Sequence, residues 1–237
     1  MRLIVTNDED AIKSIIKATN RQTQVTDDQF FAVEEFPKQL EDFFQAFDGD
    51  KKLYYERRSG QYERFPIQKT RIITQPDVIK SFAAMFLAEA HRTTRSYSSL
   101  KAKVGGEIFA KGHRMEPYYA AAYAFYKVDF LFRNKRIEPQ CKPARFHILL
   151  AARLLCAADQ IPLMNSREME RYCTSILNTL WDSSQSDALL TRAVQVVREV
   201  ANGDFDRDRI RTETFTAGVI DKCREIRALE AGNEVRI

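Results

Sequence analysis

The chain has 237 residues, of which 44% are hydrophobic and 30% are charged. This composition excludes a disordered or fibrous protein and provides enough apolar side chains for one large core or two smaller ones. The 37 basic and 33 acidic residues give a net charge of +4, which permits an anionic partner such as nucleic acid but does not require one.

No apolar run approaches the roughly 20 residues that a helix needs to cross a bilayer. The first eight residues become acidic too early for a signal peptide. The four cysteines, Cys141, Cys156, Cys173 and Cys223, show no C-x-x-C spacing. We therefore expect free, buried thiols in a cytoplasmic protein that has no membrane segment, no bound metal and no cofactor.

The amino-terminal residues predict a short strand at 3–5 and then a helix. Thr6 and Glu9 have the spacing of a capping box, and an apolar stripe follows to residue 19. A wholly polar segment comes next: Asn20, Arg21, Gln22 and Thr23. These side chains either end the helix by bonding to nearby backbone or form a row of donors that faces a ligand.

A Phe-rich amphipathic helix is predicted over residues 36–47, with Pro37 in its first turn. Two extended runs, 53–58 and 61–65, then flank Ser59-Gly60, which is typical of a tight β-hairpin. In that register Tyr55, Arg57, Tyr62 and Arg64 share one face, and Glu56 and Arg58 lie on the other. Guanidinium groups interleaved with phenol rings would suit a phosphate, a carboxylate or a stacked base.

The rest of the chain favours helices. A strand at 70–74 leads into a helix that begins at Gln75, and an aromatic helix follows Pro117. Residues 146–156 are apolar nearly all round, which predicts a central buried helix, and further helices are predicted at 169–181, 189–200 and 212–229. We expect a mostly α protein with a small β component. Its predicted parts are an α+β region at 1–140 that contains the hairpin and a helical bundle at 141–237, and the two can form one continuous domain.

Enzyme motifs are scarce. Neither a Gly-rich phosphate loop nor a G-x-S-x-G segment occurs in the sequence. Asp50 and Lys52, with Asp27 or Asp28 upstream, have the residue types of a metal-dependent nuclease, but so short a pattern is common by chance. We expect no enzyme activity from this chain, and a nuclease is the alternative.

Two motifs resemble a known family, the abortive-infection phage-resistance (AIPR) proteins of bacteria. Its Asn-x-Gln-Thr segment matches Asn20, Gln22 and Thr23, and its Tyr-Glu-Arg-Arg segment matches residues 55–58. The resemblance covers about residues 1–155 and implies a role in phage defence. A further Asn-Gly-x-Gln-Thr segment of the family is missing here, so we expect a carboxy-terminal portion of a longer protein.

Three hypotheses follow for function. The first is a binding module whose polar segment and hairpin contact nucleic acid or another anionic ligand; its site residues are Asn20, Arg21, Gln22, Thr23, Tyr55, Glu56, Arg57, Arg58, Tyr62 and Arg64. The second is the nuclease. In the third, the hairpin docks against an upstream region of the same protein. A homo-oligomer is compatible with all three.

Overall fold

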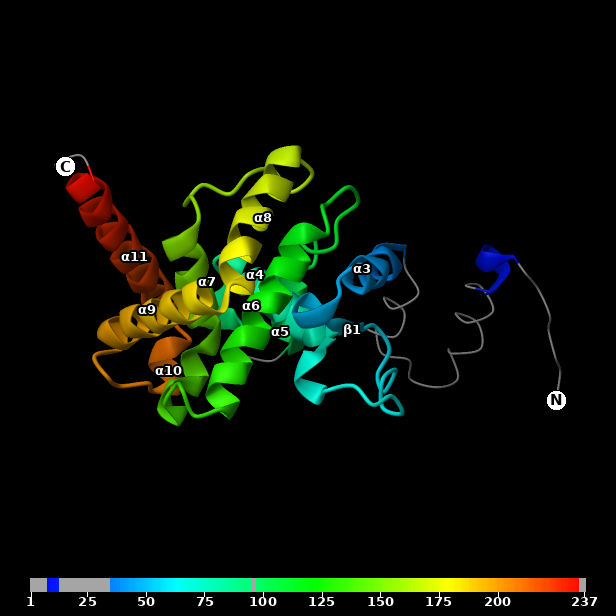
Figure 1. The fold of residues 1–237 in the computed structure, drawn as a ribbon, viewed down its shortest axis with the longest axis horizontal. Coiled ribbons are helices and arrows are strands. Elements are labelled where there is room, and N and C mark those ends of the chain that lie inside the picture. The colour runs from blue at the N-terminus through cyan, green and yellow to red at the C-terminus, as the bar shows by residue number, and fades with distance from the viewer. Residues whose placement is uncertain (1–7, 13–34, 95–96, 235–237) are drawn as a thin grey trace.

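The computed structural model describes residues 8–12, 35–94 and 97–234 of the chain. The predicted strand at 3–5, most of the first helix and the polar segment Asn20, Arg21, Gln22 and Thr23 lie outside these residues. The described part is a helical body, with α11 at one end and α3 with β1 toward the other (Figure 1).

The elements follow one another in this order. The α-helices are α3 (Glu35–Gln45), α4 (Gln75–Phe86), α5 (Tyr97–Val104), α6 (Glu116–Arg133), α7 (Arg145–Cys156), α8 (Arg167–Trp181), α9 (Ser183–Ala201), α10 (Arg207–Ile210) and α11 (Glu213–Glu234). The strands are β1 (Tyr54–Glu56) and β2 (Ile72–Thr74), and the 3-10 helices are η2 (Gly49–Lys51), η3 (Lys69–Arg71), η4 (Ala90–Arg92) and η5 (Pro139–Ala144). The predicted class, mostly helical with a small β component, is confirmed.

Helix α7 lies at the centre of the body, as its sequence predicts. It is buried continuously from Phe146 to Leu154, because its apolar side chains face neighbours on every side. Helices α4, α6, α9 and α11 all pack against it. One continuous core runs from Leu40 on α3 to Cys223 on α11. The division into regions at 1–140 and 141–237 stays a prediction.

Most of the aromatic side chains of α6 lie in the core. Tyr118, Tyr119 and Tyr123 are almost fully buried, and the alanines between them allow neighbouring helices to approach closely. The Tyr123 hydroxyl donates to the Asp50 carbonyl at 3.1 Å, and the Tyr119 hydroxyl donates to the Lys51 carbonyl. The phenol groups therefore hold η2 against the helical body.

The predicted β-hairpin is wrong. Strand β1 pairs in parallel with β2, in the register Tyr54–Ile72, Tyr55–Ile73 and Glu56–Thr74. Residues 58–65 form successive turns, in which the amides of residues 61, 63 and 65 donate to the carbonyls three residues earlier at 3.0–3.1 Å. Gly60 has a φ of +76°, which suits a turn but does not specify which strand pairs with β1.

Helix boundaries follow local capping chemistry. Thr74 and Asp77 form a capping box that starts α4 at the predicted Gln75. Helix α9 starts six residues before the predicted 189, because the Asp182 side chain accepts from the Gln185 amide at 2.8 Å. It ends at Asn202, whose φ of +50° is left-handed.

Two further expectations can be compared with the described residues. The four cysteines are free; Cys141, Cys173 and Cys223 are buried and Cys156 is half-buried. None of the described helices combines the length and the apolar character that membrane crossing requires.

Candidate functional site

The predicted Tyr/Arg face does not form, and Tyr55 shows why. Its side chain is fully buried, and its ring centroid lies 5.6 Å from that of Phe44 on α3. Strand alternation within β1 points Tyr55 into the core, while Tyr54 and Glu56 on either side are half-buried. Tyr55 is thus a core residue in this structure.

Arg57 lies beside a carboxylate rather than on an open surface. Its Nε donates to Glu41 Oε2 of α3 at 2.7 Å, and each of these two side chains is only 11% exposed. The Gln61 amide donates to the other Glu41 oxygen. Glu41 therefore joins α3 to the turn at 58–65, in keeping with charges that are paired when buried.

The remaining predicted residues of this segment either stabilise the turn or are exposed to solvent. Glu56 Oε1 accepts from the Gly60 amide at 3.1 Å, which closes the turn. Burial, and secondarily the charge of Glu41, raise the pKa of Tyr62 to about 12. Arg58 and Arg64 are exposed. Ligand binding by these residues and by Asn20, Arg21, Gln22 and Thr23 stays a prediction.

The nuclease residues do not converge within the described chain. The Asp50 side chain is fully exposed, with one oxygen 3.4 Å from an Arg71 nitrogen, and Lys52 Nζ donates to the Gln45 carbonyl at 2.6 Å. Asp27 and Asp28 lie outside the described residues. Among the side chains that the structure places, no group of three His, Cys, Asp or Glu could hold a metal ion.

A cationic pocket lies elsewhere, between the helices. It has a volume of about 440 Å³ and draws its wall from α4, η5, α7, α10 and the segment after η4. The lining residues are Lys80, Thr93, Thr94, Pro139, Lys142, Pro143, Arg145, Phe146, Arg207, Ile210 and Arg211. Five of them are cationic, and none of these described lining residues is acidic.

Local structure positions each cation. Lys80 is half-buried on α4, whereas Lys142 on η5 and Arg207 on α10 are exposed. Arg145 is the first residue of α7, and its guanidinium lies over the rings of Phe125 and Phe146, 5.5 and 4.9 Å from their centroids. Stacking of this kind holds the planar cation in one place.

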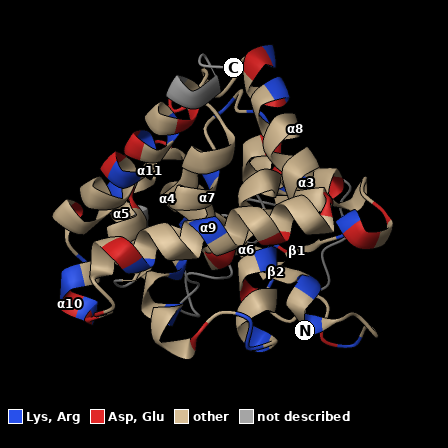
Figure 2. Ribbon diagram, turned by 60° about the vertical axis from the view of Figure 1, so that its left-hand side comes forward, with Lys and Arg blue, Asp and Glu red and all other residues tan. Residues whose placement is uncertain are grey.

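Arg211 is the fifth cationic residue that lines the pocket. Its guanidinium donates to the Thr94 carbonyl at 3.4 Å and lies 3.6 Å from Asp208. Figure 2 shows basic and acidic positions alternating on α10, next to this wall. The arginine thus connects the end of α10 to the segment after η4.

The electrostatics of the pocket are those of cations crowded together. Burial lowers the pKa of Lys80 from its ordinary value, and the positive charge of Arg145 lowers it further. Helix α7 begins here with Ala144 at its N-cap, which offers no capping side chain. The positive end of the helix dipole therefore adds to the field of the five cations.

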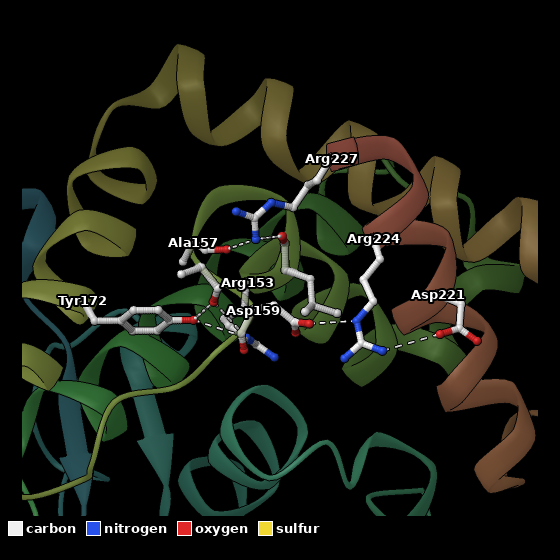
Figure 3. A network of polar contacts seen from close by, with 9 residues as sticks. Arg153, Ala157, Asp159, Tyr172, Asp221, Arg224 and Arg227 are labelled. Atoms are coloured by element: carbon white, nitrogen blue, oxygen red, sulfur yellow. Dashed lines mark hydrogen bonds and ion pairs between the residues drawn. The ribbon is translucent and has the colours of Figure 1, made fainter. Parts of the chain in front are cut away.

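A second arginine cluster, at the other end of α7, is satisfied by its own chain (Figure 3). Arg153 is buried, and it donates to the carbonyls of Met85 at 3.1 Å and Asp159 at 3.1 Å and to the Tyr172 hydroxyl at 3.2 Å. Arg227 donates to the Ala157 carbonyl at 2.6 Å. These guanidinium groups cap helix ends and offer little to a ligand.

A buried polar chain joins α11, α7 and η4. Thr216 Oγ1 on α11 lies 3.0 Å from His147 Nε2 and 3.3 Å from His91 Nδ1. His147 follows the lining residue Phe146, and burial, with a smaller effect from His91, lowers its pKa to about 3. It is therefore a neutral core histidine.

The pocket was missed in the sequence because its cations come from separate segments. Lys80, Lys142, Arg145 and the arginines at 207 and 211 span more than half of the chain, and each has ordinary neighbours. The sequence feature that comes closest to indicating the pocket is the run Asp206-Arg207-Asp208-Arg209-Ile210-Arg211. Its alternating charges are typical of a solvated turn. Only the fold brings these side chains together.

The described fold and this pocket define a mostly helical protein with a concentrated cationic recess. The family model described as AIPR protein matches residues 1–218, so the chain belongs to the AIPR family. Membership indicates a role in abortive infection, a form of phage defence. The match also extends well past residues 1–155, over which the sequence resemblance was expected. No curated protein and no solved structure matches the chain significantly.

Proposed function

We propose that this AIPR family protein acts in phage defence by recognising a phosphate-bearing anion in the cationic pocket. One observation carries the proposal: five cationic side chains from three stretches of the chain surround a recess of about 440 Å³, and none of its described lining residues is acidic. Recesses of this size, with a few convergent polar groups, are typical of ligand sites.

Bringing these cations together does not stabilise the fold. Like charges brought together repel, and the lowered pKa of Lys80 reflects that repulsion as well as burial. Local arrangements that destabilise a fold are expected at functional sites. A bound anion would offset the repulsion, and phosphate accepts charge-assisted hydrogen bonds from both guanidinium and ammonium groups.

The ligand class includes nucleic acid and small phosphorylated molecules, because both present the same phosphate oxygens. Within the 54–65 segment, Arg58 and Arg64 are the exposed members of the predicted site, and they can at most extend the contact surface. We place the protein in the cytoplasm, since its four cysteines are free.

A matched pair of charge variants tests this proposal. Lys142→Gln with Arg207→Gln removes two exposed pocket cations, so the fold should tolerate it. Lys111→Gln with Arg171→Gln removes the same charge from exposed positions outside the pocket lining. Calorimetric titration with pyrophosphate should show binding to the wild type and the control and much weaker binding to the pocket variant. Equal affinity for all three proteins would refute the proposal.

A further inference from the structure

We propose that the pocket is built for a compact oligophosphate, a chain of two or three linked phosphate groups, rather than for a single phosphate or a nucleic-acid strand. This inference rests on the proposed function and specifies its ligand. The linked phosphates can belong to an inorganic ion or to a nucleoside di- or triphosphate.

Charge matching is the first reason. A single phosphate monoester carries about 1.5 to 2 negative charges at neutral pH. Within the described chain, Lys142, Arg145 and Arg207 have no carboxylate within 4 Å, whereas Arg211 has Asp208 at 3.6 Å. Burial and then the charge of Arg145 lower the pKa of Lys80, and Asp77 opposes them with a smaller effect. At least three positive charges therefore remain to be neutralised, more than one phosphate provides.

The donor inventory of the wall gives the second reason. The Thr93 hydroxyl donates to the Ala90 carbonyl at 2.6 Å, and the Thr94 hydroxyl donates to the His91 carbonyl at 3.3 Å. Both hydroxyl protons are thus already used, so among the described lining side chains the cations supply the hydrogen bonds to a ligand. Arg145 and Arg207 can each bind two oxygens at once, which suits a ligand rich in terminal oxygens.

The surroundings of the pocket provide the third reason. A nucleic-acid strand follows an extended basic track, because its phosphates are spread along a line. Helices α9 and α11, which contact η5 and α10 respectively, instead carry mixed charge (Figure 2). Their side chains pair with one another, as Lys222 does with Glu199 at 3.6 Å and Arg192 with Glu230. Among the described residues, the pocket thus gathers several cations into one recess of small-molecule size.

Calorimetry with the full chain and a graded set of anions tests the inference. The titrants are orthophosphate, pyrophosphate, tripolyphosphate, AMP, ATP and a 12-nucleotide single strand, in buffer with a chelator to remove divalent cations. We expect pyrophosphate and tripolyphosphate to bind at least about tenfold tighter than orthophosphate, because each added phosphate gains charge-assisted hydrogen bonds. ATP should exceed AMP by a similar factor.

The outcomes separate the two proposals. If orthophosphate or AMP binds as tightly as tripolyphosphate, or if the oligonucleotide binds more tightly than tripolyphosphate, the oligophosphate inference is overturned and the phosphate pocket survives. If no phosphate compound binds, both fail. Comparing ATP with tripolyphosphate then identifies the source, since tighter binding of ATP shows that the nucleoside is read as well.

The two double variants control for net charge. Lys142→Gln with Arg207→Gln should weaken tripolyphosphate binding by at least roughly tenfold and reduce the preference over orthophosphate. Lys111→Gln with Arg171→Gln should leave both unchanged. An equal loss of tripolyphosphate affinity in the two double variants would mean that binding depends on the overall charge of the protein rather than on this pocket. That result would overturn the inference.

Discussion

Arg57 and Glu41 form a 2.7 Å ion pair that joins the turn after β1 to α3, and each side chain is only 11% exposed. The pair ties an arginine of the family motif to the scaffold. Gln61 of the same turn donates to the other oxygen of the Glu41 carboxylate, so two contacts hold the turn against α3.

Arg57→Ala should therefore lower the free energy of unfolding by roughly 2 kcal/mol, because it leaves the Glu41 carboxylate buried without its cation. Denaturation in urea, followed by circular dichroism, measures the change. Arg64→Ala is the matched control from the same turn, and its effect should stay within about 0.5 kcal/mol, since Arg64 is exposed. Equal effects of the two substitutions would show that the ion pair contributes nothing.

Arg153 should be the most sensitive arginine among the described residues. Arg153→Met removes the donor shared by α4, the segment after α7 and Tyr172, and it leaves buried carbonyls unpaired (Figure 3). We expect a loss of about 3 kcal/mol or more in unfolding free energy.

The matched control is Arg224→Gln in the same cluster. Arg224 is largely exposed and pairs with Asp159 at 2.7 Å, so the change should cost at most about 1 kcal/mol. If Arg153→Met unfolds at the same urea concentration as the wild type, the network does not stabilise the fold.

His147 predicts a pH dependence of stability. Its folded pKa of about 3 lies below the unfolded value of 6.5, so the unfolded chain binds the proton more readily. The contribution is complete above pH 6.5 and is lost as the pH falls through the window between 6.5 and 3. Within that window the loss is about 1.4 kcal/mol per pH unit.

The measurement compares the wild type with His147→Gln at pH 7 and pH 5.5, by chemical denaturation. The variant should lose less stability than the wild type on acidification, because glutamine does not titrate. His91 and His113 are present in both proteins, so the comparison reports the removal of His147. An identical pH slope for the two would contradict a buried, neutral His147.

Thr216 should be needed to keep that histidine satisfied. Thr216→Val conserves shape but removes the hydroxyl that lies within hydrogen-bonding distance of both His147 and His91. We expect a loss of about 1–3 kcal/mol. Thr174→Val is a suitable control, because its exposed hydroxyl bonds only to the carbonyl of Glu170 on its own helix. Similar losses for both would contradict the proposed bridge.

The sequence was most informative where apolar periodicity is strong. The all-apolar run of α7 predicted a buried helix, which is found, and the aromatic run after Pro117 predicted a helix, which is α6. A strand at 70–74 was also predicted; residues 72–74 form β2, and residues 70 and 71 belong to η3. The pairing was wrong, because Ser59-Gly60 indicates a turn and does not specify whether β1 pairs with the next segment or with one 18 residues on.

The candidate site was not predictable by the same means. Tyr55 and Arg57 were predicted to form a ligand-binding face. Strand alternation instead buries Tyr55 against Phe44, and Arg57 pairs with Glu41. The pocket depends on contacts between α4, η5, α7 and α10, which no local pattern encodes. A cation such as Lys142 is indistinguishable in sequence from any solvated lysine.

Tripolyphosphate affinity, compared between the wild type and Lys142→Gln with Arg207→Gln, tests most directly whether the cationic pocket is the ligand site. We predict saturable 1:1 binding to the wild type and at least roughly tenfold weaker binding to the variant, with both proteins equally folded. Unchanged affinity in the variant, or no binding to the wild type, would contradict it.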